Sequence, residues 1–215
     1  MNRFKKYAYF IIILICLALF SSCQNNTIKN VPTEIIMDDG TGILAENDAV
    51  DFYFYYPENF IMQRNDAMIT IYVNDQDILQ TNIQEPDSGE YFSNMTKPNL
   101  SATVVDPSKI YGVPAGGEYQ TIDEYWKNVV LISYEEIFQD IEIVSEEDMT
   151  MGNDNDISAR KYTYTLSLSG MKFKISEIVF SKKGKIYNLT YTATENKYET
   201  YAHILTTAAE TFKFK

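Results

Sequence analysis

Few residues of this chain are suited to catalysis or to metal binding. Its 215 residues contain one histidine, His203, and two cysteines, Cys16 and Cys23. Most zinc and iron–sulfur sites need several Cys or His ligands, which three scattered residues do not supply. A Ser-His-Asp triad would lack the Gly-x-Ser-x-Gly pattern that presents its serine. We expect His203 to lie on a solvated flank of the last helix, without a catalytic or metal-binding role.

Two patterns of acidic residues allow chemistry in principle. Asp154 and Asp156 have the spacing of the first ligands of a calcium loop, but the glycine and terminal glutamate of such a loop are missing. A polar turn is the simpler interpretation, and a weak divalent-cation site is the alternative. A cell-wall hydrolase that uses dispersed carboxylates is the second alternative, and the pairs Glu135–Glu136 and Glu146–Glu147 could in principle also serve glycoside hydrolysis. In a chain with 30 Asp and Glu residues, however, such pairs are more simply a solvated face.

The first 22 residues have the pattern of a signal peptide. A positively charged segment with Arg3, Lys5 and Lys6 precedes the uncharged stretch Tyr7–Phe20. That stretch is shorter than the roughly 20 residues that a helix needs to cross a bilayer. It is therefore typical of the apolar region of a signal peptide, which is removed from the mature protein.

The sequence Ser21-Ser22-Cys23 at the end of this segment resembles the lipobox of bacterial lipoproteins, with Phe20 where leucine is usual. The resemblance implies cleavage before Cys23 and attachment of diacylglycerol to its thiol. An ordinary secretory signal and an uncleaved anchor are the alternatives. We expect a protein anchored to the bacterial cell membrane by a lipid on Cys23, facing the extracytoplasmic side. Because Cys16 would be removed, the mature chain would have no disulfide and no catalytic cysteine.

The charge of the chain restricts its partners. Removal of residues 1–22 takes away three positive charges and no negative one, which lowers the formal net charge from −12 to about −15. A field of this sign repels nucleic acid and anionic headgroups, so nucleic-acid binding is excluded. Residues 23–47 are predicted to be a tether. Apolar residues on both sides of Asp38-Asp39-Gly40 indicate that part of this tether is ordered, as a docked turn or hairpin.

Residues 48–215 are predicted to form one α+β domain. Thr121-Ile122-Asp123-Glu124 is a capping box, and Trp126 lies on the apolar face of the helix that follows. We interpret Trp126 as a core anchor; a ligand platform is the alternative. The spacing from Tyr198 to Phe212 predicts a final helix. A change of phase in the apolar alternation predicts a β-bulge near Ser176–Glu177. Predicted strands cover 51–56, 67–73, 101–105, 162–168, 171–180 and 187–191.

The two ends of this region resemble PsbP-like domains, a family named after an extrinsic photosystem subunit. Phe54–Phe60 is similar to their opening strand and turn, and Gly184–Ala193 with Thr211–Phe214 is similar to their ending. The resemblance implies an antiparallel sheet with helices on both faces, an α/β/α sandwich that the family shares with a Ran-binding nuclear transport factor. Many bacterial members are envelope lipoproteins of unassigned role. The resemblance implies function by binding and supplies no catalytic residue.

These observations together predict a non-catalytic, lipid-anchored binding or scaffolding protein of the bacterial envelope. Its partners would be the membrane, through Cys23, and another envelope protein. We expect no enzyme activity, no cofactor and no metal. The long polar segment Asn74–Asn99 is the predicted contact surface, because loops of this length are frequently functional.

Overall fold

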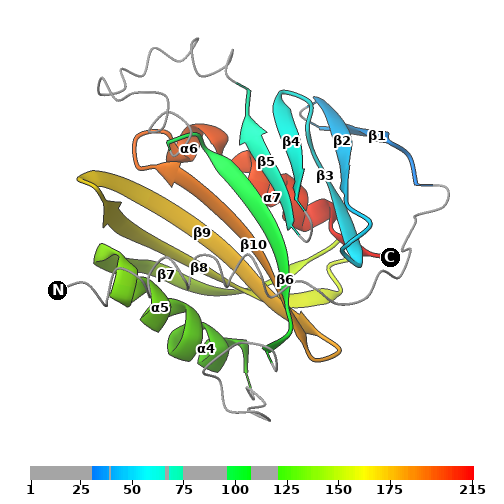
Figure 1. Ribbon diagram of the computed structural model, residues 1–215. Coiled ribbons are helices and arrows are strands. Elements are labelled where there is room, and N and C mark those ends of the chain that lie inside the picture. Colours follow the sequence, from blue (N-terminus) through cyan, green and yellow to red (C-terminus); the bar gives the residue numbers. More distant parts are fainter. Residues whose placement is uncertain (1–30, 39, 66–67, 75–95, 108–120) are drawn as a thin grey trace.

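The computed structural model describes residues 31–38, 40–65, 68–74, 96–107 and 121–215 (Figure 1). The predicted signal peptide and Cys23 lie outside the described residues, as does most of the predicted contact segment Asn74–Asn99. No helix in the described ranges is long and apolar enough to cross a membrane.

The larger of two sheets has seven antiparallel strands in the order β4-β5-β6-β10-β9-β8-β7. The long C-terminal strands alternate apolar and polar residues and form a meander, as the sequence predicts for β8, β9 and β10. The strands are β4 (Phe60–Asn65), β5 (Met68–Val73), β6 (Asn99–Val105), β7 (Gln139–Met151), β8 (Ile157–Leu168), β9 (Met171–Lys182) and β10 (Lys185–Thr194).

The smaller sheet has four strands in the order β1-β2-β3-β11. Its strands are β1 (Glu34–Met37), β2 (Gly40–Glu46), β3 (Phe52–Pro57) and β11 (Lys213–Phe214). The hairpin β1–β2 comes from the last part of the predicted tether, and β2 pairs with β3 from Gly42↔Pro57 to Glu46↔Tyr53. The chain end returns to the other side of β3 through β11.

Helices cover both faces of the larger sheet (Figure 1). One face is covered by a continuous helix made of α4 (Ile122–Tyr125), the π-helical turn η2 (Trp126–Leu131) and α5 (Ile132–Ile137). The other face is covered by α6 (Tyr198–Tyr201) and α7 (His203–Thr211), and α7 also packs against β3 of the smaller sheet. The predicted α+β class, with helices on both faces of an antiparallel sheet, is confirmed.

One prediction for strand β9, which lies between β10 and β8, is wrong. Its pairing with β8 and β10 continues without a register shift through Ser176 and Glu177, so the predicted bulge is absent from this described strand. Phe173 and Ile175 face the α4–α5 helix, whereas Ile178 and Phe180 face α7. The apolar pattern changes phase because each face of β9 packs against its own helix layer.

The start of the first helix is as predicted. Thr121 has an extended backbone, and its Oγ1 accepts a hydrogen bond from the backbone N–H of Glu124 at 3.1 Å. This bond satisfies one of the amides that a helix start leaves without a partner. Trp126 is fully buried between the helix and the sheet, which confirms its role as a core anchor.

Candidate functional site

A buried glutamate lies between the α4–α5 helix and the sheet. Glu177, on β9, is only 3% exposed. Its Oε2 accepts a hydrogen bond from Trp126 Nε1 at 3.1 Å, and the Tyr164 hydroxyl donates to the same oxygen at 3.5 Å. Burial raises the pKa of Glu177 to about 7, although these two hydrogen bonds lower it in part. Glu177 is therefore a carboxyl group that titrates near neutral pH inside the protein.

Aromatic rings surround this carboxyl group. The Trp126 ring stacks on Tyr162 with ring centroids 4.0 Å apart and planes 3° apart. Tyr164 lies tilted against Trp126 at 5.8 Å, and Tyr134 of α5 lies at the same distance from Tyr164. Rings of this size bury much apolar surface and fix the helix on the sheet. The cluster is thus a structural connection between helix and sheet that surrounds the carboxyl group of Glu177.

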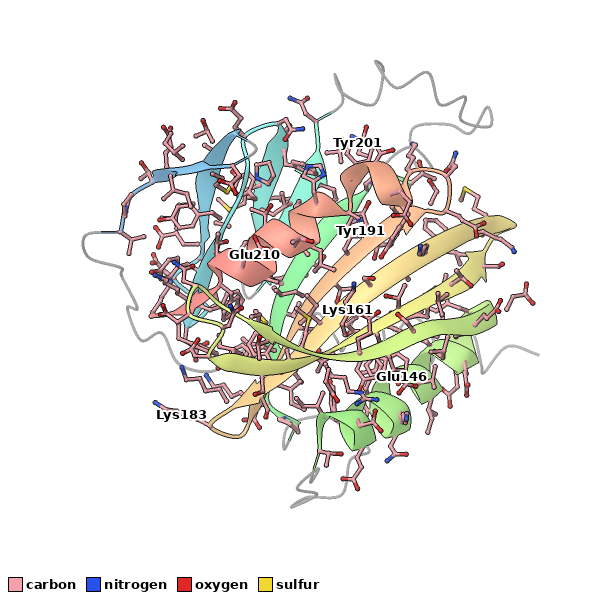
Figure 2. All side chains as sticks on the ribbon, turned by 180° about the vertical axis from the view of Figure 1, so that it is seen from behind. Glu146, Lys161, Lys183, Tyr191, Tyr201 and Glu210 are labelled. Carbon is pink, nitrogen blue, oxygen red and sulfur yellow. The ribbon has the colours of Figure 1, made fainter. Side chains whose placement is uncertain are left out.

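An ion-pair network connects the first turns of the same helix to β7 and β8. Arg160, on β8, contacts Glu146 at 2.9 Å and Asp148 at 3.0 Å on β7, and Asp123 at 3.2 Å on α4. Lys127 contacts Asp123 at 3.0 Å and Glu146 at 3.3 Å. Partial burial tends to raise the pKa of Asp123, but hydrogen bonds from Lys127 and Tyr162 and the nearby positive charges lower it below its usual value. Figure 2 shows Glu146 where β7 passes the helix.

The two carboxylate pairs that the sequence offers lie on α5 and on β7. Glu146 faces Arg160 and Lys127, and Glu147 Oε1 accepts a hydrogen bond from Ser145 Oγ at 2.8 Å. As neighbours on a regular part of β7, Glu146 and Glu147 point to opposite faces of the sheet. The residues of Glu135–Glu136 are both exposed on α5. The exposure of Glu135 and Glu136 agrees with the expected solvated face, whereas Glu146 takes part in ion pairs.

The segment with Asp154 and Asp156 forms a turn, as predicted, and this turn completes the end of α7. The turn between β7 and β8 places the Gly152 N–H 2.8 Å from the Ala209 carbonyl oxygen. The Asn153 amide, oriented to pair both of its groups, donates to the Glu210 carbonyl oxygen at 3.0 Å and accepts from Lys213 Nζ at 3.0 Å. These bonds satisfy carbonyl groups that a helix end leaves without a partner. In the described chain, no three His, Cys, Asp or Glu side chains group as metal ligands.

His203 is not on a fully solvated flank. It is half-buried, and its ring meets Phe60 edge-to-face at 5.5 Å. Together with Glu58 and Asn59 it borders a shallow hollow of about 400 Å³ between the β3–β4 turn and α7. The remaining walls come from Gly40, Thr41 and Pro57. The expectation of a solvated histidine is thus wrong in part, because the aromatic start of β4 packs against it.

A surface with exposed apolar residues lies where α5 and β7 run side by side (Figure 1). Val144 and Ile143 on β7 are 55% and 37% exposed, and Ile132 on α5 is 48% exposed. The register places Ile143 opposite Tyr164, on the face of the sheet that the helix covers. We call these three residues, together with the acidic residues of α5 and β7 that form no ion pair with the described Lys and Arg residues, the α5–β7 surface. Its acidic members are Glu135, Glu136, Asp140, Glu142 and Glu147.

The α5–β7 surface is strongly negative. Between Lys127 and Arg160 the chain has nine Asp and Glu residues and no Lys, Arg or His. Of these, Glu146 and Asp148 are paired with Arg160. The five acidic members of the α5–β7 surface form no ion pair with any Lys or Arg that the structure describes. Sequence reasoning found several of these acidic residues but missed that the same two elements carry exposed apolar side chains.

Strand β7 is also an edge. It has 13 residues, and within the described chain it pairs with β8 alone. Two register shifts, between Gln139 and Glu142 and between Ile143 and Ser145, interrupt this pairing. At the second shift Val144 has no register partner on β8, and the alternation of side chains between the two sheet faces is interrupted. Ile143 and Val144 are therefore both exposed. No strand of the described ranges pairs with the other edge of β7, whose backbone N–H and C=O groups lie next to the α5–β7 surface.

Comparison with known proteins shows that the chain resembles several solved structures in its fold. No family model matches the sequence, and no curated protein matches it. The structure is similar to PsbP from the cyanobacterium Synechocystis, with 13% identity, a TM-score of 0.48, and coverage of 91% of this chain and 99% of that one. PsbP-like domains are the family that the sequence resembles.

Two other solved structures are similar to the chain. One is LpqN of Mycobacterium tuberculosis, described as involved in cell envelope biogenesis, with 14% identity, a TM-score of 0.45, and coverage of 85% of this chain and 90% of that one. The other is a protein of unknown function from Pseudomonas aeruginosa, with 9% identity, a TM-score of 0.45, and coverage of 75% and 89%. At these identities the likeness concerns the fold alone.

Proposed function

We propose that this chain is a non-catalytic binding or scaffolding protein of the bacterial envelope, anchored by a lipid on Cys23 and facing the extracytoplasmic side. In this proposal the folded domain holds another envelope protein through the α5–β7 surface. The observation that carries the proposal is the exposure of Ile132, Ile143 and Val144 beside an edge strand. Ile143 and Val144 are adjacent in the chain, and exposed apolar side chains that lie together among polar residues are typical of protein–protein contacts.

The sequence, the contacts of the acidic residues and the net charge support the anchor and the binding role. The lipobox-like end of the signal peptide supports the anchor at Cys23. Of the glutamates that suggested hydrolysis, Glu146 takes part in the Arg160 network, and the turn that contains Asp154 and Asp156 contacts the end of α7 through the Gly152 N–H. A strongly negative domain also stands away from anionic headgroups, which leaves its surface accessible to a protein partner.

Crosslinking in living cells tests the proposal. The tagged full-length chain is treated with a chemical crosslinker, and the proteins that co-purify are identified by mass spectrometry. Three variants are compared with the wild type: Cys23→Ala, Val144→Asp and the matched control Ile61→Asp. Ile61 is 52% exposed on β4, at the opposite edge of the same sheet.

We expect one dominant envelope partner in the wild type and in Ile61→Asp. The yield should fall in Cys23→Ala, which lacks the anchor, and in Val144→Asp, because a buried unpaired carboxylate opposes the contact. Absence of an enriched partner, under conditions that capture known envelope complexes, would contradict the binding function. An equal yield from Val144→Asp and Ile61→Asp would contradict the assignment to the α5–β7 surface.

A further inference from the structure

We propose that the partner binds by adding a strand to the free edge of β7, through an extended segment in which Lys or Arg residues alternate with β-branched or apolar residues. This inference rests on the proposed function and names the class of partner that the α5–β7 surface accepts. In strand addition, backbone hydrogen bonds supply affinity and alternate side chains supply specificity.

The backbone of β7 is suited to this mode of binding. With 13 residues, it is the longest strand of the described chain, and its register with β8 is regular from Ser145↔Thr163 to Met151↔Ile157. That regular part alone offers an extended template on the side away from β8. The side chains of Ile143 and Val144 lie at the start of it and would be covered by apolar residues of an added strand.

The charges of β7 determine which strand it accepts. The strand has five acidic residues and no basic one. Glu146 and Asp148 are paired with Arg160, whereas Glu142 and Glu147 have no ion pair with the Lys and Arg residues of the described chain. The register places Glu142 opposite Thr165 and Glu147 opposite Lys161, on the face away from the α4–α5 helix. Lys or Arg on that face of an added strand would neutralise them.

The same charges oppose pairing with a second copy of the chain. Two β7 edges in antiparallel contact would place acidic residues against acidic residues, which is destabilising. The formal net charge of −12 adds repulsion over a longer range. The two register shifts, one of them at Val144, further interrupt the strand, as in natural sheets that avoid indiscriminate pairing. The free edge of β7 should therefore pair poorly with β7 of a second copy and well with a strand of opposite charge.

The test uses a fluorescent peptide of about ten residues with alternating Lys and Val, a typical strand length. The control peptide has Pro in place of Val, so it keeps the charge but lacks half of the backbone N–H groups. Binding to the full-length chain in detergent is measured by fluorescence anisotropy. Hydrogen exchange by mass spectrometry then locates the protected amides.

We expect the Lys-Val peptide to bind, to protect amides within Gln139–Met151, and to bind more tightly than the Lys-Pro peptide. The double variant Glu142→Lys with Glu147→Lys should bind about tenfold more weakly, since both complementary charges are reversed. The control variant Glu34→Lys with Asp48→Lys has the same net charge and should bind as the wild type does, because both residues are exposed in or next to the smaller sheet.

Three results would overturn the inference. Equal binding of both peptides would indicate general attraction between opposite charges. Association of the chain with itself, protected at Gln139–Met151, would indicate that a second copy occupies the edge. Absence of peptide binding, while a partner is still captured in cells through Val144, would contradict strand addition and leave the proposed function standing. Circular dichroism of each variant would show that it is folded.

Discussion

The substitution Glu177→Gln tests whether the buried carboxyl group makes stability depend on pH. The ordinary pKa of a glutamate is about 4.5, and burial raises that of Glu177 to about 7. Because the folded pKa is the higher of the two, folding favours the protonated form. The contribution of this group to the free energy of unfolding is fully present below pH 4.5. It decreases as the pH rises through 7 and is constant above that value.

The size of the effect follows from the shift. A change of about 2.5 pH units in pKa corresponds to roughly 3 kcal/mol, at 1.36 kcal/mol for each unit. Glutamine keeps an oxygen that accepts the hydrogen bond from Trp126 Nε1 and does not ionise. Relative to the wild type, Glu177→Gln should therefore gain about 3 kcal/mol of stability between pH 4 and pH 8.

The assay is urea unfolding at several pH values from 4 to 8. It is followed by the fluorescence of Trp126, which is the only tryptophan of the chain and stacks inside this cluster. Glu210→Gln, at an exposed position near the end of α7, is the matched control (Figure 2). Its difference from the wild type should not follow the same pH profile. A stability difference between Glu177→Gln and the wild type that stays constant from pH 4 to pH 8 would refute the reasoning.

Three further predictions concern the polar contacts around the two helix layers. Arg160→Met should cost about 1 kcal/mol at low salt and much less in about 1 M NaCl, since partly exposed ion pairs are weak and screened; an equal loss at both salt concentrations would contradict this. Gly152→Ala should cost about 2 kcal/mol or more in urea unfolding, because Gly152 has φ +85° and an added Cβ would lie 3.1 Å from Asp156 Oδ1. The control Gly184→Ala, with φ +77° and no atom within 4 Å of such a Cβ, should cost less; the reverse order would contradict the packing argument. Millimolar calcium should leave the melting temperature unchanged, and a rise that is lost in Asp154→Asn with Asp156→Asn would establish a cation site instead.

Local patterns in the sequence were sufficient for much of the fold. The alternation in β8 and β10 and the capping box at Thr121 depend on residues close in the chain, so their signals are visible without tertiary contacts. The β-prone residues of Met68–Val73 likewise predict β5.

Other elements depend on contacts that the sequence does not show. Strand β7 is rich in Glu and Asp, which disfavour strands, and it forms because β8 supplies its hydrogen bonds. The burial of Glu177 depends on Trp126, which lies 51 residues away in the chain. Its only local signal is that it shares the alternation of Phe173 and Ile175, on the face that the α4–α5 helix covers. The exposure of Val144 depends on a register shift and has no local signal.

The most direct test of the proposed function places a photo-crosslinking amino acid at position 144 of the full-length chain in living cells. The same group at position 61, on the opposite edge strand, is the control. We predict a light-dependent adduct of one defined mass with an envelope protein from position 144 and none from position 61. Adducts of the same mass and yield from both positions, or none from position 144, would contradict binding through the α5–β7 surface.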